Sequence, residues 1–241
     1  MSCFRFPFDL RTLLVMVSAA WLASFAHEFT HHATAAAICG ATGRMSLSLF
    51  AIDAGCGPDW PWSTAAGPAL SYALMWLGIP MLATPRWRLA GFALVIANKP
   101  FLRLFTVLAG GGDEGVLWGL VSPMHGRWLA SASVALLVMP PLLACWRVLV
   151  PHRRGLAFTG AMLLPMLPIL PVPFLDSRFY GAWVGGSVDL AAGFGVPWSV
   201  WAVEVLVLVG LVALARRSRP LQCADDATPD PHPGRPRRDH P

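Results

Sequence analysis

His27, Glu28 and His31 form the pattern His-Glu-x-x-His. Residues four positions apart lie on one face of a helix, so both imidazoles can bind a single metal ion. Glu28 is rotated about 100° from His27 around the helix, where its carboxylate can take a proton from water without binding the metal. This spacing is typical of the helical zinc sites of metallopeptidases, and it predicts hydrolytic chemistry.

A catalytic zinc ion needs a third protein ligand. Asp113 is the best candidate, because the glycines of Gly110–Gly112 interrupt a helix and let the backbone approach closely. His27 lies about 21 Å along its helix from Leu13, so we expect it at about the same depth in the membrane as Asp113. We therefore expect His27, His31 and Asp113 to bind Zn²⁺, with Glu114 as the alternative third ligand.

The elements that position these residues are apolar enough to cross a membrane. The chain has 241 residues, of which 56% are hydrophobic and 13% are charged, and that charged fraction is about half of the soluble average. Stretches of about 20 apolar residues are the expected length of a transmembrane helix. We predict six such spans, at residues 12–38, 62–83, 88–108, 127–149, 155–173 and 197–215.

These spans predict an all-α polytopic membrane protein with one transmembrane domain over residues 1–215. Asn98-Lys99-Pro100 should break the third span, and four prolines should make the fifth irregular. The alternation of Met45–Phe50 predicts a short β-strand after the first span. Residues 216–241 are rich in Pro, Asp and Arg and are expected to be a disordered tail.

Arginines flank alternate ends of the predicted spans, so the positive-inside rule places both termini in the cytoplasm. The net charge of +5 then reflects orientation and contact with anionic lipid rather than nucleic-acid binding. Lys99 is the only lysine. The excess of arginine favours a GC-rich bacterial genome, and therefore a bacterial inner membrane.

The second span contains Ala66-Gly67-Pro68, and Gly67 and Ser71 form a small pair that permits close helix packing. This motif follows His27–His31 and precedes Asp113–Gly115. The three motifs in this order resemble the site-2 protease family of intramembrane zinc metallopeptidases. The chain has Ser71 where that family usually has asparagine, and Glu114 stands between the aspartate and the glycine.

The resemblance implies that His27, His31 and Asp113 bind zinc and that Glu28 is the catalytic carboxylate. It also implies that the segment around Gly67 and Ser71 flanks the substrate, a membrane protein whose transmembrane helix is locally unwound before cleavage. Unwinding is needed because a helical peptide bond in lipid is hydrogen-bonded and shielded from water.

Other interpretations of the same residues remain open. The chain could be a catalytically inactive scaffold of the same fold that binds partner helices, or a transporter whose polar residues line a pathway. His27, His31 and His32 also resemble one histidine box of a di-iron enzyme, although such sites need several boxes. The first span could be a signal peptide, but its apolar run continues well beyond the possible cleavage site.

Four further residues have two interpretations each. His32 either orients a partner of the site or faces water near the end of the span. Lys99 either stabilises a kinked helix or pairs with a buried carboxylate. Cys39 and Cys56 bracket a loop outside the cytoplasm, where they either form a disulfide bond or remain as two thiols.

Overall fold

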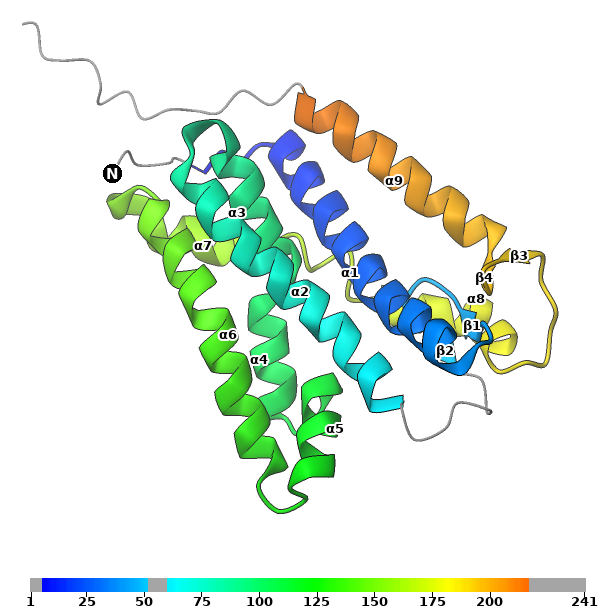
Figure 1. Cartoon of the computed structure of the whole chain (residues 1–241). Helices are drawn as coiled ribbons and strands as arrows, with labels where there is room; N and C mark the ends of the chain where they lie inside the picture. The colour runs from blue at the N-terminus through cyan, green and yellow to red at the C-terminus, as the bar shows by residue number, and fades with distance from the viewer. Residues whose placement is uncertain (1–5, 52–59, 217–241) are drawn as a thin grey trace, which may run out of the picture.

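The computed structural model describes residues 6–51 and 60–216 (Figure 1). The chain is an all-α polytopic membrane protein, as predicted. Its helices are α1 (Leu10–Cys39), α2 (Trp60–Ala83), α3 (Arg88–Ala97), α4 (Pro100–Leu108), α5 (Gly112–Val121), α6 (Gly126–Val148), α7 (Arg154–Leu163), α8 (Val172–Val184) and α9 (Trp198–Arg216). Short 3-10 turns, η1 (Pro85–Trp87) and η2 (Pro151–Arg153), precede α3 and α7. The strands are β1 (Arg44–Met45), β2 (Phe50–Ala51), β3 (Ala192–Gly193) and β4 (Val196–Pro197).

Within the described residues, 5 helical segments are long and apolar enough to cross a membrane. They are Leu10–Cys39, Trp60–Ala83, Pro85–Leu108, Gly126–Val148 and Trp198–Arg216. They correspond to the first, second, third, fourth and sixth predicted spans. The chain is therefore a multi-pass integral membrane protein.

The predicted fifth span, residues 155–173, is not one continuous helix. It begins in α7, which ends at Leu163, and passes through turns until α8 begins at Val172. Prolines at positions 165, 168, 171 and 173 remove backbone N–H donors throughout this stretch, so helical hydrogen bonding cannot be maintained. In Figure 1 the connecting segment passes behind the bundle from α7 to α8.

The predicted break in the third span is present. α3 ends at Ala97 and α4 begins at Pro100. Lys99 between them has the left-handed value φ 54°. A proline disfavours helical geometry in the residue before it, which explains why the helix is interrupted at this position.

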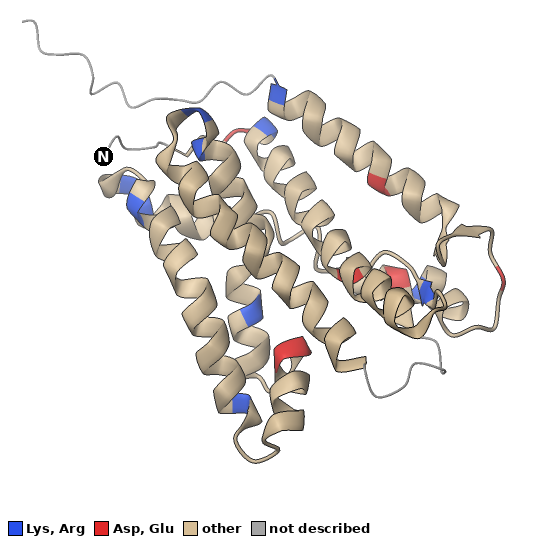
Figure 2. Ribbon diagram, viewed as in Figure 1, with Lys and Arg blue, Asp and Glu red and all other residues tan. Residues whose placement is uncertain are grey.

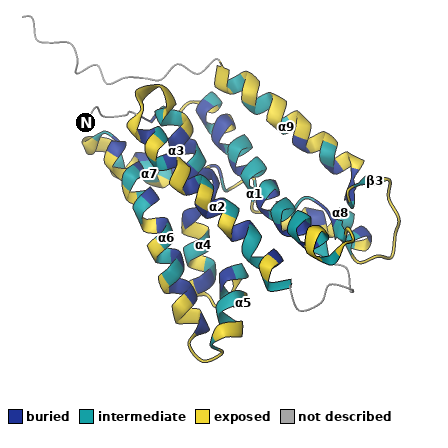
Figure 3. Cartoon of the chain, viewed as in Figure 1, coloured by how far each residue is buried: buried dark blue, intermediate teal, exposed yellow. Residues whose placement is uncertain are grey.

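α1 lies at the centre of the bundle and packs against α2, α3 and α9 (Figure 1). The main buried cluster lies between α2, α3 and α6 and includes Met75, Phe92 and Val134. The outward faces remain apolar, with Leu136 and Leu206 each more than 70% exposed. These exposed faces (Figure 3) suit contact with lipid chains rather than with water.

Two small hairpins lie near the carboxyl-terminal end of α1. The predicted β segment after the first span is present, as a hairpin in place of one strand: β1 and β2 pair in antiparallel fashion, and residues 46–49 form the turn between them. β3 and β4 form the second hairpin. The amide of Met45 donates to the carbonyl of Gly195, which joins the two hairpins.

Cys39 is disulfide-bonded. Cys56, its predicted partner, lies outside the described residues, as does the predicted tail beyond Arg216.

Candidate metal site

Three predicted ligands meet between α1 and α5. The Nε2 atoms of His27 and His31 lie 3.1 Å apart. The Oδ2 atom of Asp113 lies 3.1 Å from His27 Nε2 and 3.4 Å from His31 Nε2. One ligand atom from each residue lies within 4.8 Å of the other two, so the group could hold a metal ion.

His31 is held in the orientation that metal binding requires. Its Nδ1 atom lies 2.7 Å from the carbonyl oxygen of Ser63, at the start of α2. A carbonyl only accepts hydrogen bonds, so Nδ1 carries a proton, and Nε2 is the ring nitrogen that would bind a metal. The side chain is 1% exposed and stacks against Phe50 of β2, with ring centroids 5.2 Å apart.

Gly67 allows α2 to approach this imidazole. A Cβ atom at position 67 would lie 2.3 Å from His31 Nε2, a distance that real Cβ atoms do not show. Pro68 follows inside the same helix, and both residues are buried. Gly67 therefore contacts the predicted ligand His31, which is how the small-residue motif of the second span reaches the site.

The other nitrogen of His27 is surrounded by polar groups. Its Nδ1 atom lies 3.2 Å from the hydroxyl of Ser71 and 2.8 Å from Nη2 of Arg103. The same Arg103 nitrogen donates to Ser71 at 2.9 Å. Ser71 is 2% exposed. Its hydroxyl therefore forms a buried contact with the predicted ligand His27, on the ring side opposite the cluster.

Asp113 and Glu114 point to different partners. Asp113 completes the histidine cluster, whereas Glu114 accepts hydrogen bonds from Tyr72 at 2.5 Å and from Arg103 at 3.1 Å. Burial alone would raise the pKa of Asp113, but hydrogen bonds from His27 and His31 outweigh that effect and hold the pKa well below its usual range. Asp113 is therefore an ionised carboxylate, as a metal ligand must be.

The glycines around Asp113 bring it to this place. Gly110 and Gly112 have φ values of 86° and 81°, which side chains other than glycine rarely adopt. They turn the chain between α4 and α5, so that Asp113 lies in the first turn of α5. This is the helix interruption that the glycine-rich segment predicts.

Glu28 lies on the neighbouring face of α1 and is half-buried. Its carboxylate interacts electrostatically with His31, Asp113 and Lys99. It also lines a cavity of about 130 Å³ together with Lys99 and Glu204. Figure 2 shows that few charged residues lie within the helical bundle, and ionisable residues inside membrane-spanning segments usually serve a function.

The loop between β1 and β2 forms one wall of this cavity, to which Leu47 and Ser48 contribute. Asp176 of α8, which is 1% exposed, holds the loop in place. Its carboxylate accepts bonds from the hydroxyls of Ser46 and Ser48, at 2.7 and 2.8 Å, and from the amides of Leu47 and Ser48, at 3.3 and 2.7 Å.

Other polar residues of the spans also have defined partners. His32 is buried, contrary to the expectation that it faces water, and its Nε2 donates to the carbonyl of Phe194 at 2.8 Å. Lys99 donates to the hydroxyl of Ser24 at 2.7 Å. Glu204 accepts from the indole of Trp21 at 2.8 Å, whereas its Oε2 atom has no partner among the described residues.

Sequence reasoning did not identify Arg103, Tyr72, Ser63 or Asp176 as parts of this region. One signal was available for Arg103 and Asp176: each is an ionisable residue within or next to a predicted span, and such residues are rare there without a function. No local signal marks the backbone carbonyl of Ser63. No protein-family model, curated protein or solved structure matches the chain.

Proposed function

We propose that this protein is an intramembrane zinc metallopeptidase of the site-2 protease type, which hydrolyses peptide bonds in transmembrane substrates. The observation that carries the proposal is the spacing of the three ligand atoms. Ligands bound tetrahedrally at 2.0–2.1 Å from one zinc ion lie about 3.3 Å apart. The separations between His27, His31 and Asp113 are 3.1, 3.1 and 3.4 Å.

The chemistry of the donors supports zinc as the metal. Two imidazole nitrogens and one carboxylate form the ligand set of several catalytic zinc sites, which keep the fourth position for water. His31 directs its Nε2 atom toward the cluster, because Nδ1 donates to Ser63. The side chain of Asp113 is 32% exposed, so a reactant can approach the cluster from the side of Asp113.

A zinc ion in this position would supply Lewis-acid activation of water and of the scissile carbonyl group. Glu28 is placed beside the ligands without being one of them, and it accepts the proton that the attacking water loses. It then donates this proton to the leaving amine nitrogen as the peptide bond breaks. The cavity beside Glu28, which Ser48, Lys99 and Glu204 also line, places polar groups next to these proton transfers inside an otherwise apolar bundle.

We further propose an orientation in a bacterial inner membrane, with both termini in the cytoplasm. The start of α1, the α2–α3 junction and the end of α9 lie at one end of the bundle (Figure 1). Arg11, Arg86, Arg88 and Arg216 belong to these ends. By the positive-inside rule this end faces the cytoplasm, and the metal ligands lie nearer the opposite end.

The test is a zinc analysis combined with hydrolysis of a membrane-embedded substrate library by the full chain in lipid nanodiscs. We expect about one zinc per chain and cleavage that Glu28→Gln abolishes without loss of metal. Zinc binding without cleavage of any substrate, in wild type and Glu28→Gln alike, would favour the inactive scaffold. A well-folded wild type without zinc would overturn the peptidase proposal.

A further inference from the structure

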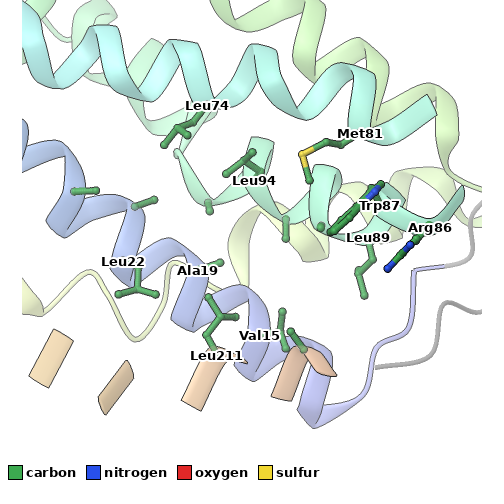
Figure 4. A pocket seen from close by; sticks show the side chains of 16 residues that line it. Val15, Ala19, Leu22, Leu74, Met81, Arg86, Trp87, Leu89, Leu94 and Leu211 are labelled. Carbon is green, nitrogen blue, oxygen red and sulfur yellow. The ribbon is translucent and has the colours of Figure 1, made fainter. Parts of the chain in front are cut away.

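A second cavity, of about 580 Å³, lies between α1, α2, α3 and α9 and extends along α1 as far as Ala26, the residue before the predicted ligand His27. It is lined by apolar side chains, with one charged exception, the guanidinium of Arg86 (Figure 4). Along α1 it extends from Val15 to Ala26, which corresponds to about 16 Å of helix. The cavity is thus a long apolar groove with a positive charge near one end.

The shape of the groove follows from small residues and from the position of α9. Ala19, Ala23 and Ala26 of α1 and Ala90 of α3 are among its walls, and alanine leaves space where a larger side chain would fill it. On the other side, Leu211 and Ala215 of α9 contribute the wall. α9 packs mainly against α1, so the space between α9 and α3 stays open toward the lipid.

Arg86 is exposed in the turn η1, and its guanidinium lies over the ring of Trp87 at 5.4 Å. It makes no hydrogen bond or ion pair with any residue that the structure describes. Asp9, an acidic residue at the same end of the bundle, is engaged in capping α1 through the amide of Thr12 at 2.6 Å. The charge of Arg86 is therefore available to an external anion.

A second guanidinium lies near the same end of the groove. Arg11 donates two hydrogen bonds to the carbonyl oxygen of Leu214, at 2.9 and 3.2 Å. Leu214 precedes Ala215, a residue of the groove wall. Two positive side chains thus lie at the end of the bundle that carries most of the flanking arginines. Trp87 lies at the same end, as expected of a tryptophan at a membrane–water interface.

We propose that this groove binds an anionic phospholipid, with its phosphate at Arg86 and one acyl chain lying along α1 and α3. The groove offers a continuous apolar wall about 16 Å long that ends at one cation, and this combination matches an acyl chain joined to a charged headgroup. The charge of the guanidinium selects an anionic headgroup, because interfacial arginines attract anionic lipids.

The experiment is native mass spectrometry of the full chain in detergent, titrated with phosphatidylglycerol or with phosphatidylcholine. We expect one phosphatidylglycerol to bind in preference to phosphatidylcholine. Arg86→Gln should weaken its binding about fivefold, which is the attraction lost with one interfacial arginine. Ala90→Trp should remove binding by filling the groove from an exposed position.

Arg153→Gln is the matched control, because it removes an exposed arginine from η2, outside the groove. It should leave phosphatidylglycerol binding unchanged. Equal binding of the two lipids by wild type, or equal effects of Arg86→Gln and Arg153→Gln, would overturn the proposal. It would also fall if a photoreactive group at position 90 captured a protein helix instead of phosphatidylglycerol in native membranes.

Discussion

The imidazole of His31 donates through Nδ1 to the carbonyl oxygen of Ser63 over 2.7 Å. This one contact between α1 and α2 determines which ring nitrogen of His31 faces the histidine–aspartate cluster. Because the acceptor is a backbone atom, no substitution at position 63 removes it directly. The geometry of α2 therefore controls the orientation of this ligand.

Gly67→Ala should displace His31 and weaken zinc binding, because the added Cβ would lie 2.3 Å from Nε2. Overpacking of this kind costs about 1–3 kcal/mol of folding free energy. Zinc stoichiometry and thermal unfolding of the purified chain measure both effects. Gly210→Ala in α9 is the control, since a Cβ there meets nothing within 4 Å. Normal zinc content in Gly67→Ala would contradict the packing argument.

Asp113→Ala and His31→Ala should each lose zinc, whereas Glu114→Gln should retain it. The reason is that Asp113 contacts both imidazoles, while Glu114 is bound by Tyr72 and Arg103. Metal analysis after dialysis against a weak chelator separates these variants. If Glu114→Gln lost zinc and Asp113→Ala kept it, the assignment of the third ligand would be reversed.

Glu28→Gln should retain zinc while reducing cleavage by about 10²–10⁴-fold, the usual contribution of a general base. The amide preserves the size of the side chain but cannot accept the proton from water. The measurement is the single-turnover rate on a substrate identified with the wild type. A rate within threefold of wild type would show that another group takes the proton.

Arg103→Gln should destabilise the fold, which thermal unfolding of the purified chain measures. It leaves Glu114 buried without a cation, and breaking a buried pair costs about 3–5 kcal/mol. The side chains of Arg103 and Glu114 are 11% and 9% exposed.

The double variant Arg103→Gln, Glu114→Gln tests the same pair. Removing both charges should recover much of the lost stability, because no uncompensated carboxylate remains. Additive losses of stability in the double variant would argue against direct coupling of Arg103 and Glu114.

Asp176→Asn should loosen the loop between β1 and β2, because the loss of the negative charge weakens all four hydrogen bonds that the carboxylate accepts. Hydrogen exchange at Leu47 and Ser48 should increase at least tenfold, while exchange within α6 stays unchanged. Ser177→Ala at the next position of α8 is the control, since its exposed hydroxyl donates within α8, to the carbonyl of Phe174. Unchanged exchange in the loop would show that other contacts hold it.

Several features could be predicted because they depend on residues close together in the chain. Long apolar runs identify membrane-crossing helices regardless of how these helices later pack. The spacing of His27 and His31 puts them on one face of any helix, and Pro100 interrupts a helix through its own ring. The prolines of residues 155–173 also interrupt helices locally. We expected an irregular span there, and the structure has two helices joined by turns.

Tertiary structure alone decided which partner each polar side chain finds. Asp113 and Glu114 are adjacent and chemically alike, and only the packing of α5 against α2, α4 and α6 directs the first to the histidines and the second to Arg103. Similarly, Asp176 reaches the β1–β2 loop across about 130 intervening residues. Sequence determined the membrane class and the histidine pair, because helical periodicity is local; the remaining contacts depend on how distant helices pack together.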